Sequence, residues 1–588
     1  MRVADYVIEF LAAKGIRHPF VVTGRGALFL NDALAKSDAV DPVFTHHEQA
    51  AAFAAVGAAD VTGAPQAAIV STGCASTNVI TGVLSAWQDH IPLIVISGQN
   101  SLKETTRHTG LPIKTYGQQE ADIIALVEPI CKSAVMLEEP ARIRYELEKM
   151  FHLAMDGNKG PVWLDVPIDI QNARIDPQGL EGFTAEDTAF PLSEEQAEML
   201  AGYLRAAERP AVLIGAGARA AGPALEAFCD GHSIPIVYAA SAVDVVPSSK
   251  AISIGSVGSQ GCSRQGAFTV QNADLLIVLG SRLNSLTTGP DLCDFARNAK
   301  TVVVDINAEE HEKDGARIDL FIQARAADVV ASLAAHDLPD YAPWLSRARS
   351  WKTAFSGNPE FTSRDGLVDL YDVATGLPDC LPDHGAFVCD SGFIDVIVPT
   401  NAAFKPGQRV VRPVSQGAMG FALPAAIGVS RVSDRPVLCM VGDGSIMMNL
   451  QELETIARSC ANVKIIVVEN GMYAIIRRRQ EQLFRGRTVG VDADTGLPTP
   501  NFEAIAAAFG LPFIAATAAT YQTTLAQAFE APGPMLITLP GKPNQSYIEI
   551  GYGRDQDGRL ARRPLEDQKP FLDRDVFAAY MAAPKVDA

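Results

Sequence analysis

The sequence has few cysteines, and they do not form the spacings that metal sites or disulfide frameworks use. Nine cysteines are scattered over 588 residues, with no CxxC pair and an odd total. This pattern is typical of reduced thiols in a cytoplasm and argues against a secreted, disulfide-bonded domain. We therefore expect a cytoplasmic protein whose fold does not depend on disulfides.

Long apolar runs and an excess of positive charge are also missing. No run approaches the roughly 18–20 apolar residues that a membrane-spanning helix needs. Asp5, Glu9 and Lys14 interrupt any signal-peptide core near the N-terminus. The chain has 49 basic and 68 acidic residues, a formal net charge of −19. This balance disfavours nucleic-acid and anionic-membrane partners, so we expect small-molecule partners instead.

Short apolar runs, each followed by glycine or a polar turn, dominate what is present. Between them lie Ala-, Leu- and Glu-rich stretches with helical periodicity. Continuous apolar strands that alternate with helices indicate parallel sheets buried on both faces, so we predict an α/β fold with doubly wound parallel sheets. The runs are 67–73, 91–98, 162–167, 211–217, 275–281, 301–306, 436–444 and 463–470.

Two polar, loop-like stretches divide the chain. Residues 175–196 and 336–366 lack the apolar periodicity of their surroundings. We therefore predict three α/β units, followed by a charged tail that wraps over the surface. The predicted bounds are 1–175, 190–340 and 360–550, with the tail at 551–588.

One strand–helix–strand segment carries the clearest chemical signal. A strand at 436–441 exits through the turn Gly-Asp-Gly; we predict a helix over 445–459 with Ser445 as its N-cap, then a strand ending at Asn470. Asp443 and Asn470 then emerge at the carboxyl ends of neighbouring parallel strands, where such sheets bind ligands. Carboxylate and amide oxygens suit Mg²⁺, and a helix N-terminus suits phosphate. Gly-Asp-Gly alone is equally typical of a plain turn; the combination favours a Mg²⁺–diphosphate site.

Three segments together resemble thiamine-diphosphate (ThDP) enzymes of the acetohydroxyacid synthase type, the acetolactate synthase large subunits. They are 44–99, 416–428 and the Gly-Asp-Gly to Asn470 segment. Within that group the chain, including "RPLEDQKPFLDRD" in the tail, is most similar to synthase-like carboligases of surface-polysaccharide and branched-sugar pathways. The resemblance implies pyrimidine-binding (1–175), middle (190–340) and diphosphate-binding (360–550) domains.

The resemblance implies catalytic roles for residues in two of these units. Glu48 matches the glutamate that hydrogen-bonds the aminopyrimidine ring and promotes loss of the thiazolium C2 proton. Gly417 matches the carbonyl that accepts from the 4′-amino group, and Met419 the apolar wedge that bends the cofactor. Gln119 matches a glutamine near the reacting carbon. Taken alone, "HHEQ" is also typical of the polar start of a helix.

The resemblance also implies a metal and diphosphate site. Asp443, Asn470 and the carbonyl of Met472 match the Mg²⁺ ligands, and Gly444 and Ser445 match the diphosphate contacts. In this family the glutamate and the metal site come from different subunits. A homodimer is therefore the minimum expected assembly, and a homotetramer is the larger expected one.

The chain departs from the synthases where they bind the second oxo acid. Leu286 stands where they carry an Arg that grips the acceptor carboxylate, and Leu cannot replace that contact. Arg25, or the cluster Arg477–Arg479, is an alternative anion site, although the cluster is also typical of a solvated helix face. The other departures are Ile168 for Lys, Gln118 for Phe, Arg479 for Trp, and Arg25-Gly26 for a Gly pair.

The middle unit keeps some nucleotide-binding features. "GAGAR" (215–219) follows a strand, Asp305 ends another, and Arg282 is retained, but a full GxGxxG is lacking. By the resemblance, two positions that contact FAD in the synthases differ here: Asn158 stands for an Arg, and Arg325 stands for an Asp. FAD therefore stays open for this unit, and so does a degenerate or adenosine-only site. Four histidines are open between proton transfer and structural roles: His46, His47, His90 and His108.

We therefore predict a ThDP- and Mg²⁺-dependent carboligase. It would decarboxylate a 2-oxo acid, pyruvate being the first choice, and transfer the acyl carbanion to an aldehyde or ketone. One alternative is a ThDP-dependent decarboxylase or C–C lyase acting on a hydroxyacyl or diketone substrate. Another is a catalytically silent regulatory subunit, against which the presence of Glu48, Asp443 and Asn470 argues.

Overall fold

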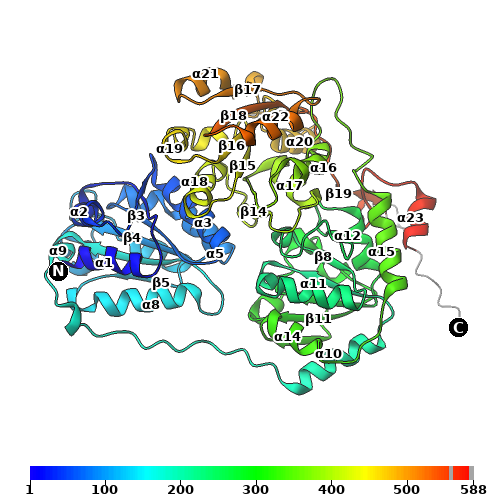
Figure 1. The fold of residues 1–588 in the computed structure, drawn as a ribbon, viewed down its shortest axis with the longest axis horizontal. Coiled ribbons are helices and arrows are strands. Elements are labelled where there is room, and N and C mark those ends of the chain that lie inside the picture. Colours follow the sequence, from blue (N-terminus) through cyan, green and yellow to red (C-terminus); the bar gives the residue numbers. More distant parts are fainter. Residues whose placement is uncertain (555–559, 582–588) are drawn as a thin grey trace.

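The computed structural model, which describes residues 1–554 and 560–581, contains three six-stranded sheets in which all neighbouring strands are parallel. The strand orders are β2-β1-β3-β4-β6-β5, β12-β11-β10-β7-β8-β9 and β14-β13-β15-β16-β18-β17. Helices flank each sheet (Figure 1). The predicted α/β class with three doubly wound sheets is confirmed.

The first sheet belongs to the N-terminal unit, drawn in blue to cyan in Figure 1. Its strands are β1 (Phe20–Val21), β2 (Val43–Phe44), β3 (Gln66–Val70), β4 (Leu93–Gln99), β5 (Ser133–Met136) and β6 (Val162–Pro167). Its helices are α1 (Val3–Ala13), α2 (Leu28–Lys36), α3 (Glu48–Thr62), α4 (Cys74–Asn78), α5 (Ile80–Gln88), α6 (Thr106–Thr109), α7 (Ile123–Val127), α8 (Ile143–Met155) and α9 (Ile168–Asn172).

The second sheet forms the middle unit, drawn in green. Its strands are β7 (Pro210–Ile214), β8 (Ile236–Tyr238), β9 (Ser253–Ser256), β10 (Leu275–Leu279), β11 (Lys300–Asp305) and β12 (Leu320–Gln323). Its helices are α10 (Glu194–Ala206), α11 (Gly222–Gly231), α12 (Arg264–Asn272), α13 (Ser285–Thr288), α14 (Ala326–Leu333) and α15 (Ala342–Ala354).

The third sheet carries the Gly-Asp-Gly segment. Its strands are β13 (Ala386–Cys389), β14 (Arg409–Val411), β15 (Val437–Gly442), β16 (Val463–Glu469), β17 (Phe513–Ala515) and β18 (Met535–Pro540). Its helices are α16 (Leu370–Cys380), α17 (Gly392–Asn401), α18 (Ala422–Val432), α19 (Glu452–Ser459), α20 (Ala474–Leu483), α21 (Phe502–Ala508) and α22 (Tyr521–Glu530).

The central strands are buried along their whole length because helices cover both faces of each sheet. Every residue of β3, β4 and β6 is buried, as is every residue of β10. This explains why these strands are continuously apolar in sequence and do not alternate with polar residues. In the described part of the chain, no helix combines the length and apolar character needed to cross a membrane.

Helix α3 joins the first unit to the third by packing closely on α18 (Figure 1). The approach depends on small residues: a Cβ added to Gly57 would lie 2.7 Å from the carbonyl oxygen of Ala425. A Cβ added to Gly428 would overlap the carbonyl oxygen of Ala54. The Ala-rich composition of α3 therefore serves a close helix crossing between two units that are far apart in sequence.

All three units also meet at one buried ion cluster. Asp244 of the middle unit accepts from Arg409 Nε of β14 and from Arg219 Nη2, each at 2.8 Å. Arg409 also donates to the backbone oxygens of Asp60 and Val61 at the end of α3, at 3.1 and 3.2 Å. One guanidinium group thus holds the three units together.

The tail returns to the body of the molecule. Strand β19 (Glu549–Ile550) pairs antiparallel with β22 (Gln568–Lys569), and β20 (Tyr552–Arg554) pairs with β21 (Leu560–Arg562). Helix α23 (Arg574–Met581) then packs against α12. The predicted tail 551–588 also includes 555–559 and 582–588, which lie outside the described residues.

Candidate active site

The predicted metal ligands lie together at the carboxyl edge of the third sheet. Strands β15 and β16 are neighbours, with Gly442 opposite Val468, and Asp443 and Asn470 follow their ends. Asp443 Oδ2 accepts from the backbone N–H groups of Asn470 at 2.9 Å and Gly471 at 2.7 Å. Asn470 Oδ1 accepts from Met472 N at 3.1 Å. Burial raises the pKa of Asp443, and the backbone N–H groups around it act in the opposite direction.

The segment after Gly444 differs from the single helix predicted over 445–459. A 3-10 turn covers Ile446–Met448, and α19 begins only at Glu452. Between them, Asn449 leaves helical geometry, and its side-chain amide donates to Gly420 O at 2.8 Å and to Gln49 Oε1 at 3.0 Å. These two long-range bonds break the helix.

Ser445 precedes the 3-10 turn, as expected of an N-cap residue, but its side chain makes no capping hydrogen bond, so the predicted cap of a helix over 445–459 is wrong. Its hydroxyl donates to Asp390 Oδ2 at 2.6 Å and accepts from Gly420 N at 3.0 Å. Asp390 Oδ2 also accepts from Gly420 N, at 3.1 Å. The carboxylate therefore links the 416–420 loop to the Gly-Asp-Gly turn.

The sequence interpretation missed Asp390. It follows β13 and is fully buried, and burial raises its pKa to about 6, against the hydrogen bond from Ser445. The signal was present as the short apolar run "AFVC" followed by "DSG", which resembles the exit "VGDG" of β15. Four residues were too few to identify as a strand.

Glu48 is the first residue of α3, and its Oε2 accepts from Asn78 Nδ2 at 2.9 Å. The residue two positions earlier, His46, donates its backbone N–H to the buried carboxylate of Glu452 on α19 at 2.9 Å. Together with the bond between Asn449 and Gln49, this ties the "HHEQ" segment to the segment that follows Asp443 within one chain.

Gln119 lies on an exposed loop at the carboxyl edge of the first sheet, in a left-handed conformation with φ of +61°. Its carbonyl oxygen packs so closely on Gly73 that a Cβ there would overlap it. On the same loop, Gln118 accepts a hydrogen bond from Arg25. Gly417 and Met419 lie on the loop that Asp390 holds, and Gly417 has a φ of +58°.

The departures from the synthase pattern have defined positions. Leu286 lies on α13 with 43% of its surface exposed, and its carbonyl accepts from Ser259 N at 2.7 Å. Ile168 begins α9, and its N–H contacts the carbonyl of Asn100. Arg25 is paired with Gln118. Leu286 and Ile168 therefore offer no charge for a carboxylate, and Arg25, whose hydrogen-bond acceptor Gln118 is neutral, is the cation among these positions.

The three arginines of α20 are all engaged. Arg477 donates to Glu481 at 3.0 Å and pairs with Asp492 at 3.1 Å. The other two contact the tail: Arg478 donates to Glu549 at 2.6 Å, and Arg479 donates to Tyr547 Oη at 3.0 Å.

In the middle unit, the "GAGAR" turn packs against the exit of β10. A Cβ added to Gly217 would lie 2.9 Å from Gly280 Cα. Arg282 donates to Gln88 O at 2.8 Å and to Ser415 Oγ at 2.6 Å, so it bridges all three units. Asp305 Oδ2 lies 3.5 Å from His311 Nε2, and Arg325 lies over the ring of Phe190. Asn158 lies in the turn after α8.

The rings of His46 and His108 have protein partners, and His90 is partly buried. His46 Nδ1 lies 3.2 Å from Thr455 Oγ1, and His108 Nδ1 lies 3.9 Å from Glu138. Burial lowers the pKa of His90, and the nearby Arg282 acts in the same direction. His47 precedes α3 as its N-cap residue.

The donors at the edge of the third sheet fit a diphosphate held by a hard cation. A buried carboxylate follows β15, and an amide oxygen and a backbone carbonyl lie on the turn after the neighbouring strand β16; these are the oxygen ligands that Mg²⁺ prefers. A side chain at Gly444 would overlap the ring of Tyr473, so the close packing of this ring on the turn requires glycine there.

Comparison with known families finds three successive matches along the chain. They are "Thiamine pyrophosphate enzyme, N-terminal TPP binding domain" at residues 1–126, "central domain" at 197–333 and "C-terminal TPP binding domain" at 390–539. Thiamine pyrophosphate is another name for ThDP.

Individual relatives agree over most of the chain. The chain is 30% identical to acetolactate synthase isozyme 1 large subunit of Escherichia coli, covering 91% of this chain and 93% of that protein. It is 31% identical to the acetolactate synthase large subunit of Corynebacterium glutamicum, covering 80% and 75%. It is 28% identical to the probable large subunit of Methanocaldococcus jannaschii, covering 87% of each.

Proposed function

Since this chain belongs to the ThDP-dependent enzymes of the acetolactate synthase type, we propose that it is a Mg²⁺-dependent carboligase with its own acceptor preference. It would decarboxylate a 2-oxo acid, pyruvate being the first candidate, and transfer the acyl unit to an aldehyde or ketone. The observation that carries the proposal is the joint placement of Asp443 and the turn 470–472 at neighbouring strand ends.

The chain's residues would hold the cofactor at this edge. We assign Mg²⁺ to Asp443, Asn470 and the carbonyl of Met472, and the diphosphate to the backbone N–H groups of Gly444 and Ser445. The Ser445 hydroxyl already donates to Asp390, so its backbone is the part left for the cofactor. When bound, ThDP supplies the electron sink for decarboxylation and carbon–carbon bond formation.

The remaining assignments concern orientation and proton transfer. Glu48 would hold the proton shared with the aminopyrimidine ring, and the Gly417 carbonyl would accept from its amino group. Met419 would set the bend of the cofactor, and Gln119 would hydrogen-bond the reacting carbonyl. Among the residues that the structure describes, Asn78 is the hydrogen-bond partner of the Glu48 carboxylate and orients it.

The acceptor would lack a 2-carboxylate. Leu286 replaces the Arg clamp of the synthases, the α20 arginines are paired with carboxylates or Tyr547, and Arg25 lies on a different segment, where it donates to the neutral amide of Gln118. An entering carboxylate would lose water at Leu286 without gaining a partner. A hydrogen bond to a charged group contributes about 1.5–3 kcal/mol. Loss of the clamp should therefore lower the preference for an oxo-acid acceptor over a neutral one by about 10- to 100-fold.

Product analysis tests this proposal. Purified protein with ThDP, Mg²⁺ and pyruvate should make little acetolactate, and far more ligation product when a neutral aldehyde or ketone is added. Acetolactate formed from pyruvate alone at a comparable rate would contradict the acceptor assignment. Release of free aldehyde without ligation, or cleavage of a diketone, would favour the decarboxylase or lyase alternative.

The proposal includes an assembly, a middle-unit ligand and domain bounds. We propose at least a homodimer, supported by exposed apolar side chains beside the candidate site: Phe44, Met447 and Met448 are 52%, 44% and 48% exposed. Light scattering would test this assembly.

For the middle unit, flavin fluorescence after denaturation separates FAD from an adenosine-only ligand. The domain bounds 1–175, 190–340 and 360–550 would be tested by limited proteolysis.

A further inference from the structure

A buried carboxylate in the first sheet is linked to the loop that carries Gln118 and Gln119. Asp165 lies on β6, between β4 and β5, and is 1% exposed. Its Oδ1 accepts from Ser97 Oγ at 2.6 Å, and its Oδ2 accepts from Gln99 Nε2 at 3.1 Å, both on β4. A buried carboxylate is costly unless its oxygens are hydrogen-bonded, and here both oxygens have donors.

The direction of each hydrogen bond in this network is fixed. Ser97 Oγ accepts from Trp163 Nε1 at 2.8 Å, so its own hydrogen points to Asp165. Gln99 Oε1 accepts from Asn100 N at 3.0 Å, so the NH₂ group of Gln99 faces Asp165. Both neighbours therefore donate, and an ionised carboxylate, which only accepts, is the form that matches them.

The Gln99 amide connects this carboxylate to the loop 117–121. Its NH₂ group, which donates to the carboxylate, also donates to the carbonyl of Ala121 at 3.1 Å. The next residue, Asn100, donates from Nδ2 to the carbonyl of Gln118 at 2.9 Å. Two side chains at the end of β4 thus hold the loop at two points.

The loop depends on such contacts because Gln119 is left-handed, with φ of +61°. This conformation costs free energy for a residue other than glycine, so the surrounding structure must hold it. The carbonyl of Gln119 packs on Gly73, and two residues later the carbonyl of Ala121 is held by the Gln99 amide. The backbone conformation at Gln119 is therefore supported by contacts that lead back to Asp165.

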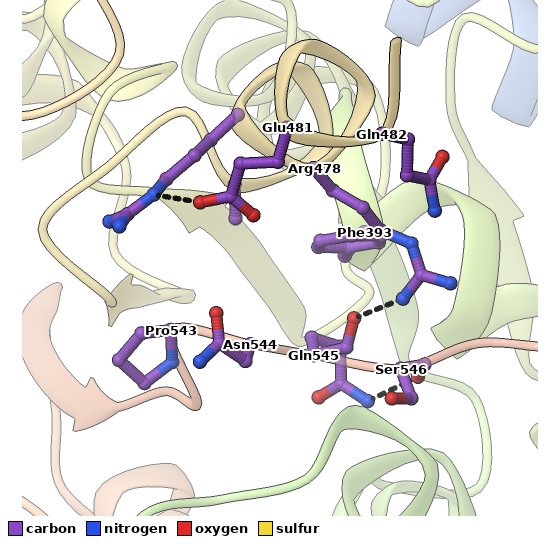
Figure 2. A pocket seen from close by; sticks show the side chains of 10 residues that line it. Phe393, Arg478, Glu481, Gln482, Pro543, Asn544, Gln545 and Ser546 are labelled. Atoms are coloured by element: carbon purple, nitrogen blue, oxygen red, sulfur yellow. Dashed lines mark hydrogen bonds and ion pairs between the residues drawn. The ribbon is translucent and has the colours of Figure 1, made fainter. Parts of the chain in front are cut away.

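No arginine or lysine contacts Asp165 in the part of the chain that the structure describes. Arg107 and Asp122, paired with each other at 3.1 Å, act on it from a distance and in opposite directions. The strands β4 and β5 and helix α7 carry no titratable side chain, and α8 and α9 pack on the opposite face of β6. Figure 2 shows a contrasting carboxylate, Glu481 on α20, which accepts from Arg477 at 3.0 Å.

Burial therefore dominates the ionisation of Asp165. Burial raises its pKa to about 7, although the hydrogen bonds from Ser97 and Gln99 act in the opposite direction. The carboxyl group is ionised above this pH and protonated below it. A proton on Oδ2 would face the NH₂ group of Gln99, which cannot accept, so this contact weakens as the pH falls.

We propose that Asp165 is a positioning residue: it orients the Gln99 amide, and this amide fixes the loop 117–121 that carries Gln118 and Gln119. This rests on the proposed carboligase function, in which Gln119 contacts the reacting carbonyl. The loop is held best while Asp165 is ionised, so turnover should decline as the pH falls.

A near-isosteric variant tests the role. Asp165→Asn keeps the side-chain volume but brings an NH₂ group to neighbours that both donate. With ThDP, Mg²⁺, pyruvate and acetaldehyde, kcat and kcat/KM at pH 8 should fall together by about 3- to 10-fold, the value of one hydrogen bond, with KM unchanged. Release of CO₂ measures turnover, and unchanged ThDP affinity shows that the variant is folded. Glu139→Gln, exposed after β5, is the control.

Two further measurements separate positioning from a general loss of structure. The kcat of the wild type should decline below about pH 7, and Asp165→Asn should lack this decline. Gln99→Met removes the link to the loop, so adding Asp165→Asn to it should have no further effect on kcat. Hydrogen exchange of 117–121 without cofactor should rise in both single variants.

The outcomes distinguish this inference from the proposed function. Unchanged kcat in Asp165→Asn, or an undiminished effect of that change in the Gln99→Met background, would overturn the inference while the carboligase function stands. Unchanged hydrogen exchange of 117–121 in both variants would also overturn it. Absence of CO₂ release by the wild type would overturn the proposed function and the inference with it.

Discussion

Glu48 begins α3, and its carboxylate accepts a hydrogen bond from Asn78. We predict that Glu48→Gln slows exchange of the ThDP C2 proton by about 10²- to 10⁴-fold, because an amide hydrogen-bonds the ring but does not hold the transferred proton. Hydrogen–deuterium exchange of bound ThDP, followed by NMR, measures this. Glu9→Gln, exposed on α1, is the control. Unchanged exchange in Glu48→Gln would remove the assigned role.

Asp443 and Asn470 allow a second test at single residues. Asp443→Ala and Asn470→Ala should each abolish Mg²⁺-dependent binding of ThDP, because each removes one of the few oxygen ligands. Calorimetry with and without a chelator measures it. Asp434→Ala, exposed before the start of β15, should bind as the wild type does. Retained affinity in both site variants would place the metal elsewhere.

Among the elements, β13 and β15 position two loops through one carboxylate. Ser445 and Gly420 both donate to Asp390, so Asp390→Asn and Ser445→Ala should disturb the same contact. Each should weaken ThDP binding, and the double variant should be little worse than the poorer single one. A coupling of about 1–2 kcal/mol is expected.

Calorimetric titration of the four proteins measures this coupling. Hydrogen exchange of 416–420 without cofactor should also rise in Asp390→Asn, which direct contact of Asp390 with the cofactor alone would not cause. Ser391→Ala is the control, because its hydroxyl makes no hydrogen bond in the part of the chain that the structure describes. Additive effects would mean that Ser445 and Asp390 act separately.

Elements differ in how well the sequence predicts them. Strands such as β10 and β16 are predictable because burial on both faces requires a continuous apolar run. The same logic places Asp443 and Asn470 at strand ends. The break at Asn449 is not predictable, because the local apolar period continues through it and the partners, Gly420 and Gln49, are distant in sequence. The side-chain cap expected from Ser445 is absent for the same reason, because the partners of its hydroxyl, Asp390 and Gly420, are also distant in sequence.

At the scale of the whole molecule, Asp244 is the shared partner of Arg219 and Arg409. Its burial opposes ionisation, but the two guanidinium groups outweigh burial and lower its pKa to about 2. Because the pKa is lowered on folding, Asp244 stabilises the protein above about pH 4 and loses this effect as the pH falls toward 2. The contribution is about 2–3 kcal/mol.

We predict that Asp244→Asn lowers stability at pH 7 by about 3–5 kcal/mol, since it removes the carboxylate 2.8 Å from both arginines and leaves Arg409 with the more distant Asp60, at 3.7 Å, as its counter-charge. It should also flatten the loss of stability between pH 4 and pH 2. Thermal unfolding followed across this range measures both effects, with the exposed Asp230→Asn as control. Burial raises the pKa of the neighbouring Asp60, so ionised Asp60 opposes the stabilising effect of Asp244 at neutral pH. An unchanged acid profile in Asp244→Asn would contradict the assignment.

The close crossing of α3 and α18 also bears on how the chain is made. The contact between Gly57 and Ala425 joins residues that leave the ribosome far apart in time. At about 5–20 residues per second, α3 would wait roughly 20–70 s for its partner helix. During that interval an Ala-rich helix that is buried on almost every side in the finished protein remains uncovered. Nascent chains stopped before α18 should therefore bind chaperones through α3, and release should follow once α18 has been synthesised.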